Sequence, residues 1–149
     1  MTLVSAGLDI FDREQFVTPT TLSCWSKMLS AARREHIELA LVSAFRSVDY
    51  QCRLIREKLE KGLDIVDIVR VNAIPGFSEH HTGRAIDITT SGCKPLSIDF
   101  DQTLAFEWLI SNAGEFNFSM SYAKNNSLGI DYEPWHWACG TDVNQQYTT

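Results

Sequence analysis

The sequence lacks the features that mark several classes of protein. Its apolar runs are far shorter than the ~20 residues that a membrane-spanning helix needs, so we predict no membrane span. It also lacks an excess of basic residues, because 19 acidic and 13 basic side chains give a formal net charge of −6. Nucleic acids favour basic surfaces, so we expect no nucleic-acid partner. No repeat, low-complexity tract or linker divides the chain, and we predict one domain over residues 1–149, expected to be a monomer.

The N-terminus lacks the basic-then-apolar order of a secretion signal, because Asp9 and Asp12 interrupt its apolar residues. Taken at face value, the sequence predicts a cytoplasmic protein. A chain whose leader had been removed would look the same and would belong in the periplasm or cell envelope. Cysteine pairs of the C-x-x-C kind are also absent. Without a leader, free buried thiols are favoured over disulfides for the scattered cysteines Cys24, Cys52, Cys93 and Cys139.

The composition is ordinary for a globular protein, with 44% apolar and 21% charged residues. Thr18-Pro19 is typical of a helix start, and a core-facing stripe follows at helical spacing: Leu22, Trp25, Met28, Leu29 and Ala32. Two more helices are predicted at 47–61, ended by Gly62, and at 97–112, ended by Gly114. In the second helix Leu104 and Trp108 are expected to face inward, with Ala105 and Leu109 as further candidates. Strands are predicted at 37–45, 116–120 and 130–137.

The segment S-E-H-H-T-G-R-A-I-D, residues 78–87, has the densest chemistry in the chain. Gly83 permits a sharp turn, and a strand-like alternation begins after it. This alternation puts Ile86 and Ile88 on an apolar face and Asp87 on a face that can look into a cleft. An imidazole on the incoming loop and the carboxylate of Asp87 could converge there. They would form part of a metal site that needs a third ligand.

The chain has only four histidines, so the search for that ligand is short. His36 follows charged residues and is interpreted as the solvated end of a helix. His136 follows Glu133 by three residues, and Pro134 between them argues against a helix interior and favours a strand end or a tight turn. Two histidines and a carboxylate would leave one position of a tetrahedral zinc ion open for water. Glu133 is the natural candidate for the base that takes the proton of that water.

Arg46 ends the strand predicted at 37–45, and an arginine there needs a partner or an anionic ligand. Local sequence favours a structural ion pair with an acidic residue. The functional alternative is a clamp for a carboxylate or phosphate, which suits the planar guanidinium. Gln51 could lie one helical turn beyond and add an amide to the same cleft.

Three motifs together carry a resemblance to a known family. S-A-F-R-S-V-D-Y-Q, S-E-H-H-T-G-R-A-I-D and Y-E-P-W-H-W resemble, in the same order, motifs of the VanY-type metal-dependent D-alanyl-D-alanine carboxypeptidases. They span about two thirds of the chain. The resemblance implies an α+β fold with a central, mainly antiparallel sheet and flanking helices. That fold is shared with the D-Ala-D-Ala dipeptidases and the Hedgehog signalling domain.

The resemblance also implies a set of site residues. It implies a zinc ion, Zn²⁺, held by His80, Asp87 and His136, with Glu133 as the catalytic base. It implies that the substrate's terminal carboxylate or adjacent peptide group is recognised by Arg46, Gln51 and Ser78. Trp135 would help wall the pocket. It assigns no ligand role to His81. The family commonly has an arginine and an aromatic residue after the W-H-W, whereas this chain has Ala138-Cys139-Gly140, which leaves substrate choice open.

The leading hypothesis is a zinc carboxypeptidase of D,D or L,D type that acts on peptidoglycan-derived peptides. A peptidoglycan endopeptidase of the phage endolysin kind is the rival within enzymes, and it would not require Arg46 to meet a free carboxylate. A catalytically silent, Hedgehog-like metal-binding domain is the third alternative. Glu133 argues against it, since zinc binding alone would not need that residue.

Overall fold

The computed structural model describes residues 1–71 and 76–140. Within these ranges helices and strands alternate irregularly, and the predicted α+β class is confirmed. The strands are β1 (Val4–Leu8), β2 (Glu14–Val17), β3 (Ala40–Ser43), β4 (Ala85–Thr89), β5 (Phe118–Met120) and β6 (His136–Cys139). The α-helices are α1 (Pro19–Arg34), α2 (Val48–Glu60), α3 (Ile65–Val71) and α4 (Leu104–Asn112). Short 3-10 helices are η1 (Glu79–Thr82), η2 (Ile98–Gln102) and η3 (Ala113–Phe116).

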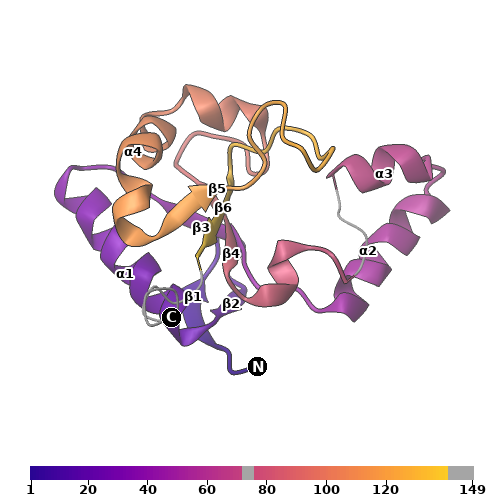
Figure 1. The fold of residues 1–149 in the computed structure, drawn as a ribbon, viewed down its shortest axis with the longest axis horizontal. Helices are drawn as coiled ribbons and strands as arrows, with labels where there is room; N and C mark the ends of the chain where they lie inside the picture. Colours follow the sequence, from indigo (N-terminus) through magenta and orange to yellow (C-terminus); the bar gives the residue numbers. More distant parts are fainter. Residues whose placement is uncertain (72–75, 141–149) are drawn as a thin grey trace.

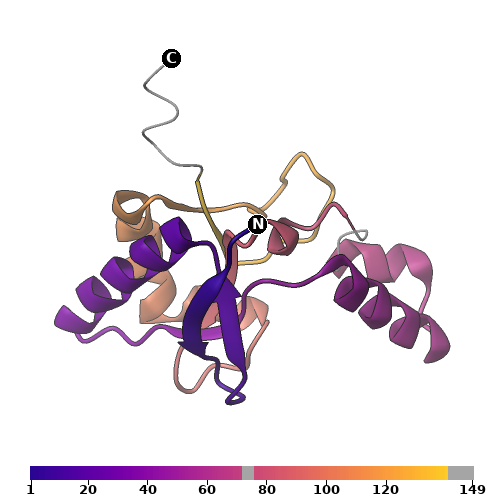
Figure 2. The same ribbon diagram turned by 90° about the horizontal axis from the view of Figure 1, so that it is seen from below.

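In the described part of the chain, the central sheet has four strands in the order β3-β4-β6-β5, and every neighbouring pair is antiparallel. Helices α1 and α4 lie on one side of this sheet, and α2 and α3 lie on the other (Figure 1). Figure 2 shows the same separation from below, with the β1–β2 hairpin between the two groups of helices. This hairpin was not predicted, because the N-terminal residues were considered only as a signal sequence.

Strand β4 separates the core from the polar side of the sheet. Ile86 and Ile88 join the buried apolar cluster that includes Trp25 and Trp108 from the flanking helices. Burying each isoleucine contributes roughly 1.5–3 kcal/mol. Asp87 points to the opposite face, where it shares a cavity with residues of α2. The predicted division of this strand into an apolar face and a cleft face is therefore confirmed.

Local signals positioned the first two α-helices correctly. Thr18 caps α1 by accepting a hydrogen bond from the Thr21 backbone N–H at 3.3 Å, and a proline occupies the first turn. Ser47 caps α2 in the same way, through the Tyr50 backbone N–H at 3.0 Å. Gly62 follows this helix with a φ of +85°, a conformation that suits glycine. Residues 63–71, where no structure was predicted, include α3.

The helix predicted at 97–112 is interrupted. Thr103 has an extended backbone, and its hydroxyl accepts a hydrogen bond from the Phe106 N–H, so η2 ends and α4 starts afresh. The restart turns Leu104 outward to 71% exposure, which contradicts its predicted inward position, whereas Trp108 is buried as predicted. Gly114 does not end the helical region either. The chain continues through η3 and turns at Asn117, whose φ is +64°.

The predicted strands are shorter in the structure. Of 37–45 only Ala40–Ser43 is strand, and of 116–120 only Phe118–Met120. The prediction for 130–137 was wrong over most of its length, because β6 begins at His136 and continues to Cys139. Pro134 has no N–H to donate to a ladder, so the residues before β6 form a turn instead.

Within the described residues, no helix is both long enough and apolar enough to cross a membrane. The four cysteines carry free thiols, as predicted, although only Cys139 is fully buried.

Candidate active site

The motif at 78–87 forms one tight turn that leads into β4. Ser78 caps η1, because its hydroxyl accepts a hydrogen bond from the His80 N–H at 3.1 Å. Gly83 ends the turn with a φ of +72°. A Cβ atom at Gly83 would lie 2.8 Å from Leu3 Cδ2, a side-chain end that would have to shift, so the positive φ is the main reason for glycine here. The turn brings His80 to the cleft face of β4.

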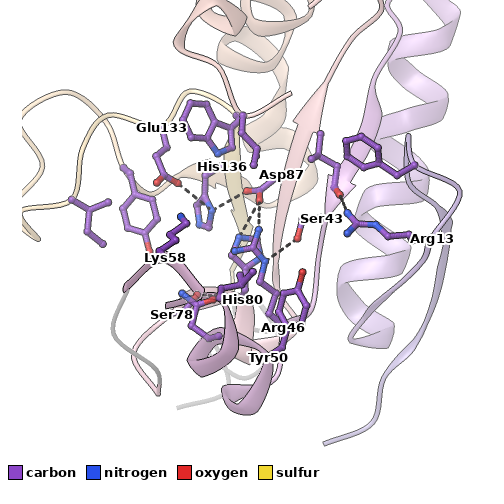
Figure 3. A pocket seen from close by; sticks show the side chains of 18 residues that line it. Arg13, Ser43, Arg46, Tyr50, Lys58, Ser78, His80, Asp87, Glu133 and His136 are labelled. Atoms are coloured by element: carbon purple, nitrogen blue, oxygen red, sulfur yellow. Dashed lines mark hydrogen bonds and ion pairs between the residues drawn. The ribbon is translucent and has the colours of Figure 1, made fainter. Parts of the chain in front are cut away.

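Three candidate metal ligands, His80, Asp87 and His136, converge in the site, and all three are buried. Their potential ligand atoms lie within 4.8 Å of one another. Asp87 and His136 are direct cross-strand partners on β4 and β6, so the sheet register itself sets their separation. Figure 3 shows both imidazoles directed at the Asp87 carboxylate.

Each imidazole is held by the nitrogen that faces away from Asp87. His80 Nδ1 lies 2.7 Å from the carbonyl oxygen of Ala44, and because a carbonyl only accepts, this nitrogen carries the proton. His80 Nε2 then faces Asp87 Oδ2 at 3.3 Å. In His136 the roles are reversed: Nε2 lies 2.8 Å from Glu79 Oε1, and Nδ1 faces Asp87 Oδ1 at 3.2 Å. One nitrogen of each ring is therefore directed into the site.

The three groups shift one another's pKa. Burial raises the pKa of Asp87, but the two imidazoles outweigh burial and hold this pKa well below its usual range. Burial lowers the pKa of His80, and Asp87 offsets part of that effect. Burial also disfavours charge on His136, yet its hydrogen bonds to Asp87 and Glu79 raise its pKa to about 9. At neutral pH, His80 is thus neutral and His136 is charged when no metal competes for its nitrogen.

Glu133 stands beside this cluster, in the turn that precedes β6. Its backbone N–H donates to the carbonyl of Tyr122 at 2.9 Å, and its own carbonyl accepts from the His136 N–H at 3.2 Å. One carboxylate oxygen lies 3.9 Å from His136 Nδ1. Burial raises the pKa of Glu133 to about 7, an effect that His136 partly opposes. A carboxylate with a pKa near the ambient pH can both take and return a proton.

Arg46 enters the site from the segment after β3. Its Nε donates to the Ser43 hydroxyl at 3.0 Å, and its Nη2 lies 3.4 Å from Asp87 Oδ2. The structural ion pair that the local sequence favoured is therefore present. The side chain also lines the cavity, as the functional alternative required.

A cavity of about 440 Å³ brings the predicted site residues together. Its lining includes every one of them, namely Arg46, Gln51, Ser78, His80, Asp87, Glu133, Trp135 and His136. His81 is absent from this lining. Its Nδ1 lies 2.8 Å from the Arg46 carbonyl oxygen, and its Nε2 accepts from the Gly76 N–H, so it fastens the turn. His36 is exposed just beyond the end of α1, as predicted.

Sequence reasoning missed three residues that the fold brings to this site. Tyr122, from the loop between β5 and β6, packs against His136 in a tilted arrangement, with ring centroids 4.5 Å apart. Burial and the nearby carboxylates of Glu79 and Glu133 raise the pKa of Tyr122, so its phenol stays protonated. Lys58 reaches the cavity from α2. Of the three, Glu79 would have been the easiest to predict, because it is the carboxylate directly before His80 in the motif.

Comparison with known proteins agrees with this geometry. Residues 14–140 match the VanY family, described as D-alanyl-D-alanine carboxypeptidase, and the chain belongs to this family. YodJ of Bacillus subtilis is 32% identical over 132 residues, which make up 83% of this chain and 46% of YodJ. The chain thus spans about half the length of that relative.

Two solved structures show the same fold. The LdcB LD-carboxypeptidase, whose structure addresses peptidoglycan recognition, has a TM-score of 0.83 and 29% identity, covering 97% of this chain and 71% of LdcB. A mutant of the D,D-pentapeptidase VanY in complex with Zn(II) has a TM-score of 0.72 and 22% identity, covering 97% of this chain and 83% of VanY. The predicted family and fold are confirmed.

Proposed function

We propose that this chain is a zinc-dependent carboxypeptidase that removes the C-terminal D-amino acid from peptidoglycan stem peptides or their precursors. One observation carries the proposal: a single cavity holds a His–Asp–His cluster, a buried glutamate and an arginine. The family to which the chain belongs is described by the same D-alanyl-D-alanine carboxypeptidase activity. We further propose that residues 1–149 form one peptidase domain. The monomeric state and the cytoplasmic location stay predictions.

The donor atoms fit a zinc ion. Two imidazole nitrogens and a carboxylate oxygen are typical ligands of catalytic zinc, and they leave a position for water or substrate. His80 and His136 each have a second nitrogen already fixed by a hydrogen-bond acceptor, as is usual for metal-binding histidines. We assign His80 Nε2, His136 Nδ1 and the Asp87 carboxylate as ligands. Zinc held there supplies a Lewis acid and lowers the pKa of a bound water.

Glu133 performs the proton transfers in this proposal. Its carboxylate takes the proton of the attacking water and later returns it to the departing amine. The turn before β6 suits this task, because Glu133 and His136 are hydrogen-bonded through their backbones and keep a fixed relation. The silent metal-binding alternative gives no reason for a buried carboxyl group with a pKa of about 7 at this place.

Arg46, Gln51 and Ser78 recognise the substrate's terminal carboxylate or the adjacent peptide group, and Trp135 walls the pocket. Arg46 has five N–H donors, and the hydrogen bonds to Ser43 and Asp87 engage Nε and one Nη2 proton. The other donors suit a carboxylate in the cavity. Asp87 and Ser43 hold the guanidinium in place beforehand, which lowers the entropic cost of binding.

The test of this function compares a peptide ending in D-Ala-D-Ala with its C-terminal amide. We expect the wild-type enzyme to cleave the acid with a kcat/KM about ten- to a hundredfold higher, the usual value of a charge-assisted hydrogen bond. Arg46→Ala should remove most of this preference, and Arg46→Lys should restore only part of it. Mass analysis identifies the products. Equal cleavage of acid and amide by the wild-type enzyme would instead favour the endopeptidase.

Zinc binding should release a proton. At pH 7 His80 is neutral, but His136 carries a proton, since its pKa is raised to about 9. Zinc must displace that proton, so its apparent affinity should rise about tenfold per pH unit below about 9 and level off above. Calorimetry in buffers of different ionisation enthalpy measures the release, with about one proton expected at pH 7. Zinc binding that takes up or releases no proton at pH 7 would contradict the Nδ1 assignment.

A further inference from the structure

Helix α2 presents one face to the catalytic cavity. Gln51, Leu54 and Lys58 all line it, at the i, i+3 and i+7 spacing that puts residues on one side of a helix. Gln51 belongs to the proposed site for the terminal carboxylate. Lys58 lies seven residues further along, and it has no part in the function proposed above. In Figure 3, Lys58 and Arg13 lie on opposite sides of the His80–Asp87–His136 cluster.

The cations that line the cavity differ in how they are neutralised. Arg13 forms an ion pair with Asp9 at 2.8 Å and donates to the Val42 carbonyl. Arg46 contacts Asp87 at 3.4 Å. For Lys58, in contrast, no hydrogen bond or ion pair is found among the described side chains, those of residues 1–68 and 76–140. The ammonium group of Lys58 is thus the one among these three that has no carboxylate partner in the described structure.

The surroundings of Lys58 make its positive charge unfavourable. The residue is half-buried, and burial lowers its pKa, as do the nearby charges of Arg46 and Lys61. No carboxylate contributes to that pKa in the opposite direction. The whole chain has a net charge of −6, so the lack of an acidic partner at Lys58 does not reflect a shortage of carboxylates in the sequence. A half-buried cation that faces a substrate cavity without a partner is well placed to receive an anion from the substrate.

We propose that Lys58 binds a second carboxylate of the substrate, separate from the terminal one, and that the enzyme therefore prefers acidic peptides. This inference rests on the proposed function, because it places the terminal carboxylate at Arg46 and Gln51. Seven residues of helix α2 span about 10 Å. An extended peptide covers that length in about three residues. The second carboxylate therefore belongs to a residue two or three positions before the C-terminal one.

The test uses two pairs of acetylated peptides ending in D-Ala-D-Ala. Within a pair, the peptides differ only by glutamate or glutamine, placed two residues before the C-terminal residue in one pair and three residues before it in the other. We expect the wild-type enzyme to cleave the glutamate peptide of one pair about tenfold faster in kcat/KM. Lys58→Met, which keeps the length of the side chain, should remove this preference, and Lys58→Arg should retain it.

Lys61→Met is the matched control, because Lys61 is an exposed lysine at the end of the same helix and does not line the cavity. It removes one positive charge and should leave the preference intact. The proposal is overturned if the wild-type enzyme prefers neither peptide, or if Lys58→Met keeps the preference. It is also overturned if Lys58→Met instead abolishes the preference for acid over amide, because Lys58 would then belong to the site of the terminal carboxylate.

Binding of the same peptides, measured by calorimetry, separates this inference from the proposed function. If none of the peptides is cleaved, the proposed carboxypeptidase activity is wrong. The second-carboxylate site is then judged on binding alone, with tighter binding of one glutamate peptide to the wild-type chain, lost in Lys58→Met, as the expected result. Equal binding of glutamate and glutamine peptides would overturn it.

Discussion

Replacing Glu133 with glutamine is expected to lower kcat by at least about 10²–10⁴-fold, the usual contribution of general acid–base catalysis. Glutamine has nearly the same shape, and the backbone hydrogen bonds that hold this turn do not involve the side chain. The amide cannot take a proton from water, so the loss should appear in kcat with bound zinc unchanged. The measurement is turnover of a D-Ala-D-Ala peptide together with metal analysis of the same sample.

Glu57→Gln serves as a control, because Glu57 is exposed on α2 and does not line the cavity. It should change kcat little. Near-normal turnover in Glu133→Gln would exclude Glu133 as the base. Loss of zinc from that variant would make it a metal ligand instead.

Removing both imidazoles, in the double variant His80→Ala and His136→Ala, should abolish zinc binding and activity together. Loss of a single outer partner of a metal ligand already costs about 10–100-fold in affinity, and loss of two direct ligands should cost more. The measurement is zinc content by atomic absorption after dialysis, with circular dichroism to confirm the fold. His36→Ala should keep its zinc, because His36 is exposed and distant along the chain from the cluster.

Asp87→Asn provides a second variant in case the double variant does not fold. It removes the ligand charge but keeps the shape of the side chain, and it should also lower zinc affinity strongly. A double histidine variant that is folded and carries full zinc would show that the metal binds elsewhere.

Local signals predicted part of the fold well. Side-chain caps and periodicity are properties of a few neighbouring residues, so the starts of α1 and α2 were correct. The break at Thr103 was missed, because a threonine inside an apolar pattern becomes a cap only when η2 and α4 pack as separate elements. The turn before His136 was predicted from Pro134 as one of two alternatives, but the strand predicted at 130–137 was too long, since the distant carbonyl of Tyr122 holds Glu133 outside the sheet.

The candidate site was predictable where its residues share a motif. His80 and Asp87 lie seven residues apart in one segment, and Glu133 and His136 lie three apart in another. Lys58 could not be found in this way, because only the packing of α2 against the cavity gives it a role. The proposed binding of a second substrate carboxylate therefore depends on the fold, because no sequence motif points to Lys58.

The hydrogen bonds around η1 couple the metal cluster to Arg46. The Arg46 N–H donates to the His80 carbonyl at 3.1 Å, and the His80 and His81 rings bond to the carbonyls of Ala44 and Arg46. These hydrogen bonds hold the segment at residues 44–46 directly against η1. If Arg46 holds the substrate's C-terminus, these hydrogen bonds fix the distance from Arg46 to the metal cluster. That distance determines how far from its end the peptide is cut. Because these hydrogen bonds set that distance, substitutions elsewhere in the cavity can change which residue is removed without changing how many.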